Sequence, residues 1–263
     1  MTSSLLRPRG RNRAAGSVVA GTAEGGTEPT PILDWENPLV AELIRSLGGP
    51  ESGLAQDPAQ LLATLRRAHG RIAATVRPVY SVQDERPVSE TLRRGRGSCS
   101  QRLAVLEAVA RASGVATRVR GLLVDGAFWY PRFPRLRRIV PDEVLLAWPE
   151  FRVAGDAPWL PVSELFGGLD ELSGLRGSGF TNSGAETLFE ALSRTAVDWD
   201  GATACPADGA SCDLSAHVLV DLGHFDSRDG LFARHGQTLC RTARLVAEPV
   251  LGRRAAGARV TLG

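Results

Sequence analysis

One cysteine lies where two features that activate thiols coincide. The segment Gly95–Gln101 (GRGSCSQ) places Cys99 at the start of an apolar pattern that continues through Leu103, Leu106 and Ala110. This spacing predicts a half-buried helix, whose N-terminus carries unpaired N–H groups and about half a positive charge. Both favour a thiolate, and the same N–H groups can stabilise an oxyanion. The pattern therefore indicates a nucleophile; the alternative is a small buried residue at a helix start.

The segments that follow Cys99 predict the elements that would position it. The helix is expected to end at Gly114, because glycine is the common residue after a helix C-terminus. Residues 115–124 (VATRVRGLLV) alternate in polarity and begin with β-branched residues, which predicts a strand, and residues 144–153 and 159–162 predict two more. A helix followed by antiparallel strands indicates the α+β fold class.

Three segments, in this order, resemble the transglutaminase-like (papain-like) superfamily of cysteine acyltransferases and proteases. They are residues 89–121 (SETLRRGRGSCSQRLAVLEAVARASGVATRVRG), Leu146–Phe151 and Trp159–Ser163. In the family these positions hold the cysteine helix, a His-Ala-Trp-x-Glu strand and a Trp-x-Pro-Val-Asp strand. The resemblance covers about residues 86–166 and implies an α+β domain in which the cysteine helix packs on antiparallel strands.

Two of the three catalytic positions implied by this resemblance hold residues that cannot perform the chemistry. Cys99 matches the nucleophile, Leu146 matches the histidine base, and Ser163 matches the aspartate that orients the histidine. In a Cys-His-Asp system the imidazole accepts the thiol proton and later protonates the leaving group. Leucine cannot transfer a proton and serine supplies no negative charge, so the resemblance implies an atypical member that lacks the His and Asp of the triad.

Three interpretations of this departure remain open. The leading functional hypothesis is an atypical cysteine-dependent enzyme that transfers acyl groups or forms or cleaves amides, with Cys99 served by a base from elsewhere. His217 is the preferred base, and His224 and His235 are further candidates. The second interpretation is a catalytically inactive relative that recognises a peptide or amide partner in its cleft. The third is a displaced strand alignment, although no histidine lies between His69 and His217.

Aromatic residues are expected to shape the substrate cleft. Trp148 belongs to the second matched segment, and Trp129 lies in Phe128–Pro134, a segment dense in aromatic residues and proline. Because this segment connects two predicted strands, it could form the wall of a pocket; the alternative is a hydrophobic loop packed on the core. The expected ligand is a peptide or a small amide or acyl compound.

The charge balance excludes one large class of partner. The chain has 31 basic and 29 acidic residues, a net charge of +2, which is too even to predict nucleic acid as the main partner. Locally, Arg135, Arg137 and Arg138 either attract an anionic group or form an ordinary solvated run. All the basic residues are arginine, and with the abundance of glycine and alanine this indicates a GC-rich, actinobacterial type of genome.

Cysteine usage and hydropathy predict a cytoplasmic protein without cofactors. The four cysteines include no CxxC pair, so free thiols are expected, although Cys205 and Cys212 flank one loop and could bridge. The segment Cys212–Asp229 gathers thiol, imidazole and carboxylate groups, but its spacing matches no metal motif, and a strand followed by a turn is the preferred interpretation. No apolar run reaches the roughly 18–20 residues that span a membrane, so no membrane partner is expected.

Composition divides the chain into four parts. The first residues are rich in glycine, serine, threonine and arginine and show no periodicity, which predicts disorder. Helix starts at Asn37-Pro38 and Asp57-Pro58 follow, and residues 184–196 and 231–251 show further helical patterns. The resulting parts are a disordered tail (1–30), a helical lead-in (31–85), the transglutaminase-like core (86–168) and a C-terminal extension of unknown role (169–263).

Overall fold

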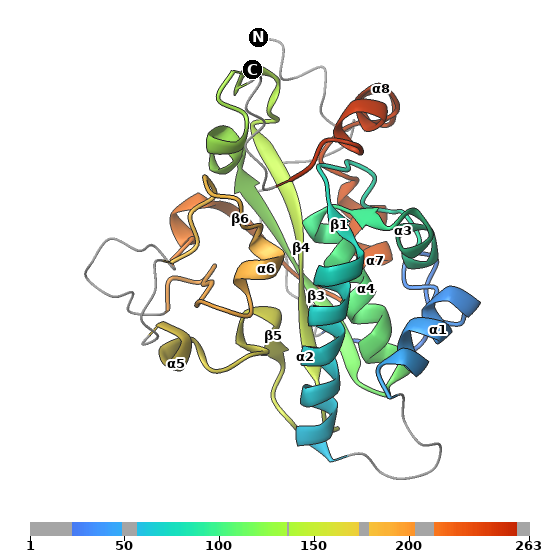
Figure 1. Ribbon diagram of the computed structural model, residues 1–263. Coiled ribbons are helices and arrows are strands. Elements are labelled where there is room, and N and C mark those ends of the chain that lie inside the picture. The colour runs from blue at the N-terminus through green and yellow to red at the C-terminus, as the bar shows by residue number, and fades with distance from the viewer. Residues whose placement is uncertain (1–22, 49–56, 136, 174–178, 203–212, 257–263) are drawn as a thin grey trace.

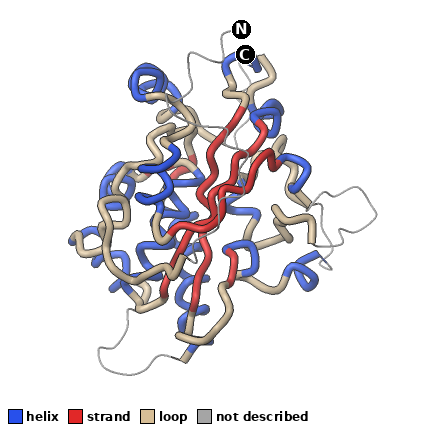
Figure 2. Tube along the Cα trace, turned by 180° about the vertical axis from the view of Figure 1, so that it is seen from behind, coloured by secondary structure: helices blue, strands red, loops and turns tan. Residues whose placement is uncertain are grey.

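The central feature of the molecule is an antiparallel sheet with the strand order β5-β4-β3-β6. The computed structural model describes residues 23–48, 57–135, 137–173, 179–202 and 213–256. Strand β3 (Ala116–Asp125) pairs along its whole length with β4 (Glu143–Arg152) and on its other side with β6 (Val218–Phe225). The short strand β5 (Leu160–Pro161) flanks β4. Figure 2 shows these strands in the middle of the molecule, with helices around them.

Helix α4 (Cys99–Ala112) is the core of the helical layer. It contacts β3 and β4 on one side and the N-terminal helices α1 (Pro38–Ser46), α2 (Pro58–Thr75) and α3 (Val88–Arg94) on the other (Figure 1). All its residues from Gln101 to Arg111 are buried, since it lies between two layers. This mixed arrangement confirms the expected α+β fold.

Local sequence explains why α4 begins at Cys99. Gly95 ends α3 with a φ of 58°, a left-handed conformation that favours glycine. The short strand β2 (Arg96–Gly97) then pairs in parallel with β1 (Arg77–Pro78). Ser98 caps α4: its Oγ accepts a hydrogen bond from the Gln101 N–H at 3.2 Å, and Gln101 Oε1 accepts one from the Ser98 N–H at 3.0 Å. Cys99 is therefore held in the first turn of a helix whose start is well defined.

The expected strands match β3, β4 and β5 to within a few residues, but the C-terminal helical patterns differ from the structure. Residues 231–251 form two helices, α7 (Arg228–His235) and α8 (Arg241–Leu251), because Gly236 adopts a φ of 70° after α7. Within 184–196, helix α6 spans only Leu188–Ala191. The remaining short elements are η2 (Gly126–Arg132), η3 (Arg137–Ile139), η4 (Val162–Glu164), α5 (Leu169–Ser173) and η5 (Ser215–His217).

The end of the predicted tail contacts the sheet. Gly26 and Thr117 exchange backbone hydrogen bonds of 3.1 and 3.0 Å, and the Glu28 carbonyl accepts a hydrogen bond from Arg111 Nη1 at 2.8 Å. Gly25 has a φ of 68°, and a Cβ there would lie 2.7 Å from the Thr117 carbonyl oxygen. Residues 23–30 therefore belong to the folded unit, while residues 1–22 lie outside the described residues.

A buried ion pair joins the C-terminal region to the core. Arg228 of α7 and Glu107 of α4 are both fully buried, with Nε and Oε1 2.5 Å apart. Arg228 also donates to Ser100 Oγ at 3.0 Å and to the Ala147 carbonyl of β4 at 3.3 Å. Burial raises the pKa of Glu107, and the guanidinium beside it opposes that rise. A single side chain thus links α7 to α4 and to the sheet.

Candidate functional site

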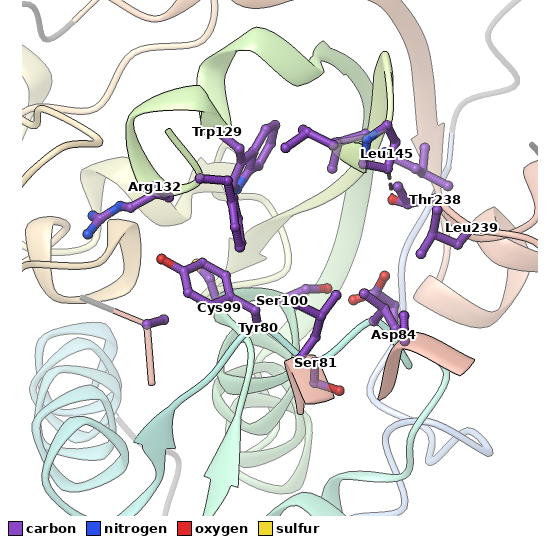
Figure 3. A pocket seen from close by; sticks show the side chains of 18 of the residues that line it. Tyr80, Ser81, Asp84, Cys99, Ser100, Trp129, Arg132, Leu145, Thr238 and Leu239 are labelled. Atoms are coloured by element: carbon purple, nitrogen blue, oxygen red, sulfur yellow. Dashed lines mark hydrogen bonds between the residues drawn. The ribbon is translucent and has the colours of Figure 1, made fainter. Parts of the chain in front are cut away.

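A cavity of about 680 Å³ lies between the N-terminus of α4, the first residues of β4, helix η2 and helix α8. Its lining is mainly apolar, with a few hydroxyl, amide and charged groups (Figure 3). The segment Pro78–Val82 supplies one wall and residues 144–146 of β4 another. The cavity therefore draws on the predicted transglutaminase-like core and on the C-terminal extension together.

Cys99 lines this cavity, but the environment of its thiol differs from the sequence expectation. Burial raises the pKa of Cys99 to about 12. The charges of Arg102 and Arg228 and a hydrogen bond from the Phe189 backbone oppose this rise, while Glu190 adds to it. Burial therefore opposes the thiolate that a helix N-terminus favours, and the role of Cys99 as a nucleophile stays a prediction.

Leu146 lines the same cavity as Cys99. It is 7% exposed and is paired with Leu122 of β3 in the centre of the sheet. Ser163 lies in η4, which follows β5 and contacts β4, and its side chain is buried. Strand β5 pairs Pro161 with Glu150, and η4 begins directly after it, so Ser163 lies next to β4 but outside the paired register. An apolar side chain therefore lines the cavity at the position that the sequence resemblance matches to the family's base.

His217, which the sequence analysis prefers as the base for Cys99, lies behind the wall of the cavity. Its ring meets Phe128 edge to face with the centroids 5.1 Å apart, and Phe128 itself lines the cavity. His217 is in η5 and is not among the described residues that line the cavity. His217 therefore remains a prediction that would require a rearrangement of Phe128 or of the segment that carries η5.

The other histidines have their own partners. His224 Nε2 lies 3.1 Å from Glu150 Oε1, and the His235 ring lies 5.5 Å from that of Phe225. His69 on α2 is buried, with Nε2 2.6 Å from the Phe189 carbonyl oxygen, and burial lowers its pKa. Within the described part of the chain, no histidine lines the cavity.

The two tryptophans predicted to bind substrate occupy different places. Trp129 of η2 lines the cavity, where Figure 3 shows it on the side opposite Tyr80. Trp148 of β4 is 3% exposed and packs edge to face against Trp199, with a centroid separation of 5.9 Å. The structure brings Trp129 together with Cys99 in one cavity, and it places Trp148 in the core beside it. The binding role of each remains a prediction.

The sequence analysis did not identify two components of the site, Asp84 and helix α8. Asp84 lines the cavity near Ser100, and burial raises its pKa to about 6, opposed by Arg228, by a hydrogen bond with Ser100 and by Arg244. Helix α8 also lines the cavity, although it belongs to the extension whose role was unknown. The apolar spacing of Ala243, Val246, Ala247 and Leu251 was the signal available for α8; Asp84 had none.

The described residues contain no group of three or more histidine, cysteine, aspartate or glutamate side chains that could hold a metal ion. Cys99 and Cys240 are free thiols and both line the cavity. Cys212 lies outside the described residues. Within the described ranges, no helix combines the length and the hydropathy required to cross a membrane.

Comparison with known proteins adds the family. Residues 41–163 match the family model of the Transglutaminase-like superfamily, a range that includes α2, α4, β3, β4 and the positions of Cys99, Leu146 and Ser163. Neither the curated proteins nor the solved structures compared with the chain gave a match. The fold, the order of the elements and this match agree, and the chain therefore contains a transglutaminase-like domain, over residues 41–163.

Proposed function

We propose that this transglutaminase-like domain binds an uncharged, largely apolar ligand, such as an acyl or amide compound or an apolar peptide side chain, without Cys-His-Asp catalysis. The observation that carries the proposal is that Cys99 and Leu146 line one apolar cavity. The raised pKa of Cys99 supports it, since the thiol form is a poor nucleophile.

The size and polarity of the cavity support a ligand of this class. A volume of about 680 Å³ falls within the range of small-molecule sites. Arg132 lines the cavity but donates to Asn182 Oδ1 at 2.8 Å and to the carbonyls of Gly184 and Glu186, so its N–H donors are already engaged. Figure 3 shows its guanidinium directed away from the centre of the cavity. The polar side chains of Ser81 and Asn182 are likewise engaged within the protein, since Ser81 Oγ donates to Glu248 at 3.0 Å and Asn182 Nδ2 donates to the Phe128 carbonyl at 2.7 Å, which leaves a mainly apolar surface for a ligand.

Isothermal titration calorimetry with N-benzylhexanamide as the probe tests this function. The wild type is expected to bind the probe, and Cys99→Ala to bind it similarly, because no bond to sulfur is required. Val144→Trp adds bulk to the cavity wall and should abolish binding. Leu219→Trp is the matched control, since Leu219 is 48% exposed on β6 and is not a lining residue.

The leading sequence hypothesis, cysteine-dependent acyl transfer, predicts a different outcome. Incubation with p-nitrophenyl hexanoate would then acylate Cys99, with release of p-nitrophenol, and hydrolysis or amine attack would turn the acyl-enzyme over. Intact-mass spectrometry of wild type and Cys99→Ala distinguishes the two. A turning-over adduct on Cys99 would overturn the binding proposal in favour of the enzyme, and a wild type that does not bind the probe would overturn it as well.

A further inference from the structure

Helix α8 is amphipathic but is oriented opposite to an ordinary surface helix. Two of its three charged residues, Arg244 and Glu248, face the body of the protein, with side chains 14% and 16% exposed. Its apolar residues Leu245, Val246 and Val250 are 63%, 74% and 68% exposed. A surface helix normally buries its apolar face, and exposed apolar patches of this kind mark sites of interaction.

Polar contacts hold α8 in this orientation. The Glu248 carboxylate accepts hydrogen bonds from Ser81 Oγ and the Val82 N–H at 3.0 Å and from Arg86 Nη2 at 2.5 Å. After the helix, the Arg254 carbonyl accepts a hydrogen bond from the Tyr80 N–H at 3.3 Å. These contacts fix the polar side inward, so the apolar side is presented to the cavity mouth and to solvent.

Arginines lie at both ends of this apolar face, at Arg241 and Arg253, and in the segment of residues 132–142 beside it; we call them the basic rim. The guanidinium of Arg254 lies 5.2 Å from the centroid of the Phe133 ring, which places the end of α8 beside the segment that contains η3. Residues 132–142 and 241–254 together hold eight arginines and two carboxylates, Asp142 and Glu248. Glu248 is already paired with Arg86. The exposed members of this basic rim are Arg135, Arg137, Arg138, Arg241 and Arg253.

We propose that this face, formed by Leu245, Val246 and Val250 with the basic rim, docks on the surface of an anionic phospholipid bilayer. Aliphatic side chains flanked by arginines match the acyl region and the phosphate groups of such a surface. A nucleic acid or another polyanion would engage the arginines and leave the aliphatic side chains in water. Docking places the mouth of the apolar cavity, where Phe133 and Val246 both lie, against the lipid. It involves no spanning segment and does not depend on which ligand the cavity binds.

Vesicle co-sedimentation tests the docking. The wild type should bind vesicles that contain phosphatidylglycerol better than vesicles of phosphatidylcholine alone, and high ionic strength should weaken this binding. Val246→Asp with Val250→Asp should reduce the bound fraction to the level of phosphatidylcholine alone. Arg137→Gln with Arg138→Gln should weaken binding by roughly fivefold for each arginine.

Matched variants on other helices serve as controls. Leu39→Asp introduces an acidic group at a 39% exposed leucine of α1, and Arg45→Gln with Arg71→Gln removes two exposed arginines from α1 and α2. Both should bind as the wild type does, and circular dichroism checks that every variant is folded. Vesicle binding and probe binding of the wild type are measured in separate experiments, so the docking and the proposed function fail separately.

Three outcomes would overturn the docking proposal. The first is a wild type that ignores phosphatidylglycerol vesicles at low ionic strength. The second is binding to polyphosphate and to vesicles that persists in Val246→Asp with Val250→Asp, which would indicate a general polyanion site. The third is a wild-type dimer in sedimentation velocity that this double variant converts to a monomer, which would show that a second copy covers the face.

Discussion

Helices α4 and α8 both line the cavity, but every residue of α4 from Gln101 to Arg111 is buried whereas no residue of α8 is. The first is held by packing between a sheet and three helices, the second by a carboxylate and a few backbone hydrogen bonds. Packing on all sides leaves one geometry for Cys99, since interiors resist displacement. Polar attachment at a surface opens at a lower free energy. The core wall of the cavity is therefore expected to be rigid, and the α8 wall to open more easily.

The largest effect is expected from removing the ion pair between Arg228 and Glu107, which holds α7 to α4 on the core side of the cavity. Arg228→Met should lower the free energy of unfolding by about 3–5 kcal/mol, because Glu107 would remain buried without its partner. Urea denaturation measures this loss. Glu107→Gln combined with Arg228→Met should recover a large part of it. A loss below about 1 kcal/mol would mean that α7 is not held to the core by this pair.

The second prediction concerns the position of Leu146. Leu146→His with Ser163→Asp should place an imidazole and its carboxylate beside Cys99 and form a thiolate–imidazolium pair. Alkylation of Cys99 by iodoacetamide at neutral pH should become at least about tenfold faster, because the wild-type thiol has a pKa of about 12 and is almost fully protonated.

Mass spectrometry after partial alkylation measures this change, and the pH profile should shift downward. Circular dichroism controls for folding, since loss of a buried leucine costs roughly 1.5–3 kcal/mol. A folded double variant with unchanged Cys99 reactivity would show that position 146 does not face the sulfur.

The third prediction sharpens the contrast at the α8 wall. Glu248→Ala removes the acceptor for Ser81, Val82 and Arg86, so the amides of α8 should exchange with deuterium roughly tenfold faster. Exchange in α4 should stay as it is in the wild type. Hydrogen exchange read by mass spectrometry reports both helices in one experiment. Equal acceleration in α4 and α8 would show that the two walls open together.

The smallest expected effect comes from Asp84, which lies between the two walls. Its pKa of about 6 in the folded chain is above the unfolded value of 3.8, so the folded chain binds this proton more tightly. The stability contributed by the protonated group is present below pH 3.8 and is lost as the pH rises through 6.

The free energy of unfolding of the wild type, relative to Asp84→Asn, should therefore fall by about 1 kcal/mol between mildly acidic and neutral pH. Parallel urea titrations at the two pH values measure the difference. Asp156→Asn, at an exposed loop carboxylate, is the control and should show no such change. A free energy of unfolding of the wild type that rose with pH, relative to Asp84→Asn, would mean that Asp84 is stabilised in its charged form.

Much of the core followed from local patterns. The start of α4 at Cys99 depends on Ser98, Gln101 and the glycine at 95, which are neighbours in sequence and so act through local hydrogen bonds. Strand β3 follows from the alternation and branching of its residues. The match of residues 41–163 to the transglutaminase-like superfamily agrees with that prediction.

The extension was harder to predict. Residues 231–251 show one continuous helical pattern in the sequence but belong to two helices in the structure, because the conformation of Gly236 ends the first helix. The pairing of Gly26 with Thr117, likewise, joins segments that no local pattern connects.

The amino-acid sequence by itself determined which side chains are present at the matched positions: a thiol at 99, a leucine at 146 and a serine at 163. It also determined the α+β class, since periodicity and capping act over a few residues. Only the tertiary structure decided the surroundings of the thiol and the orientation of α8. Both depend on what surrounds a group in space: burial sets the pKa of Cys99, and contacts from Ser81 and Arg86 turn the charged side of α8 inward.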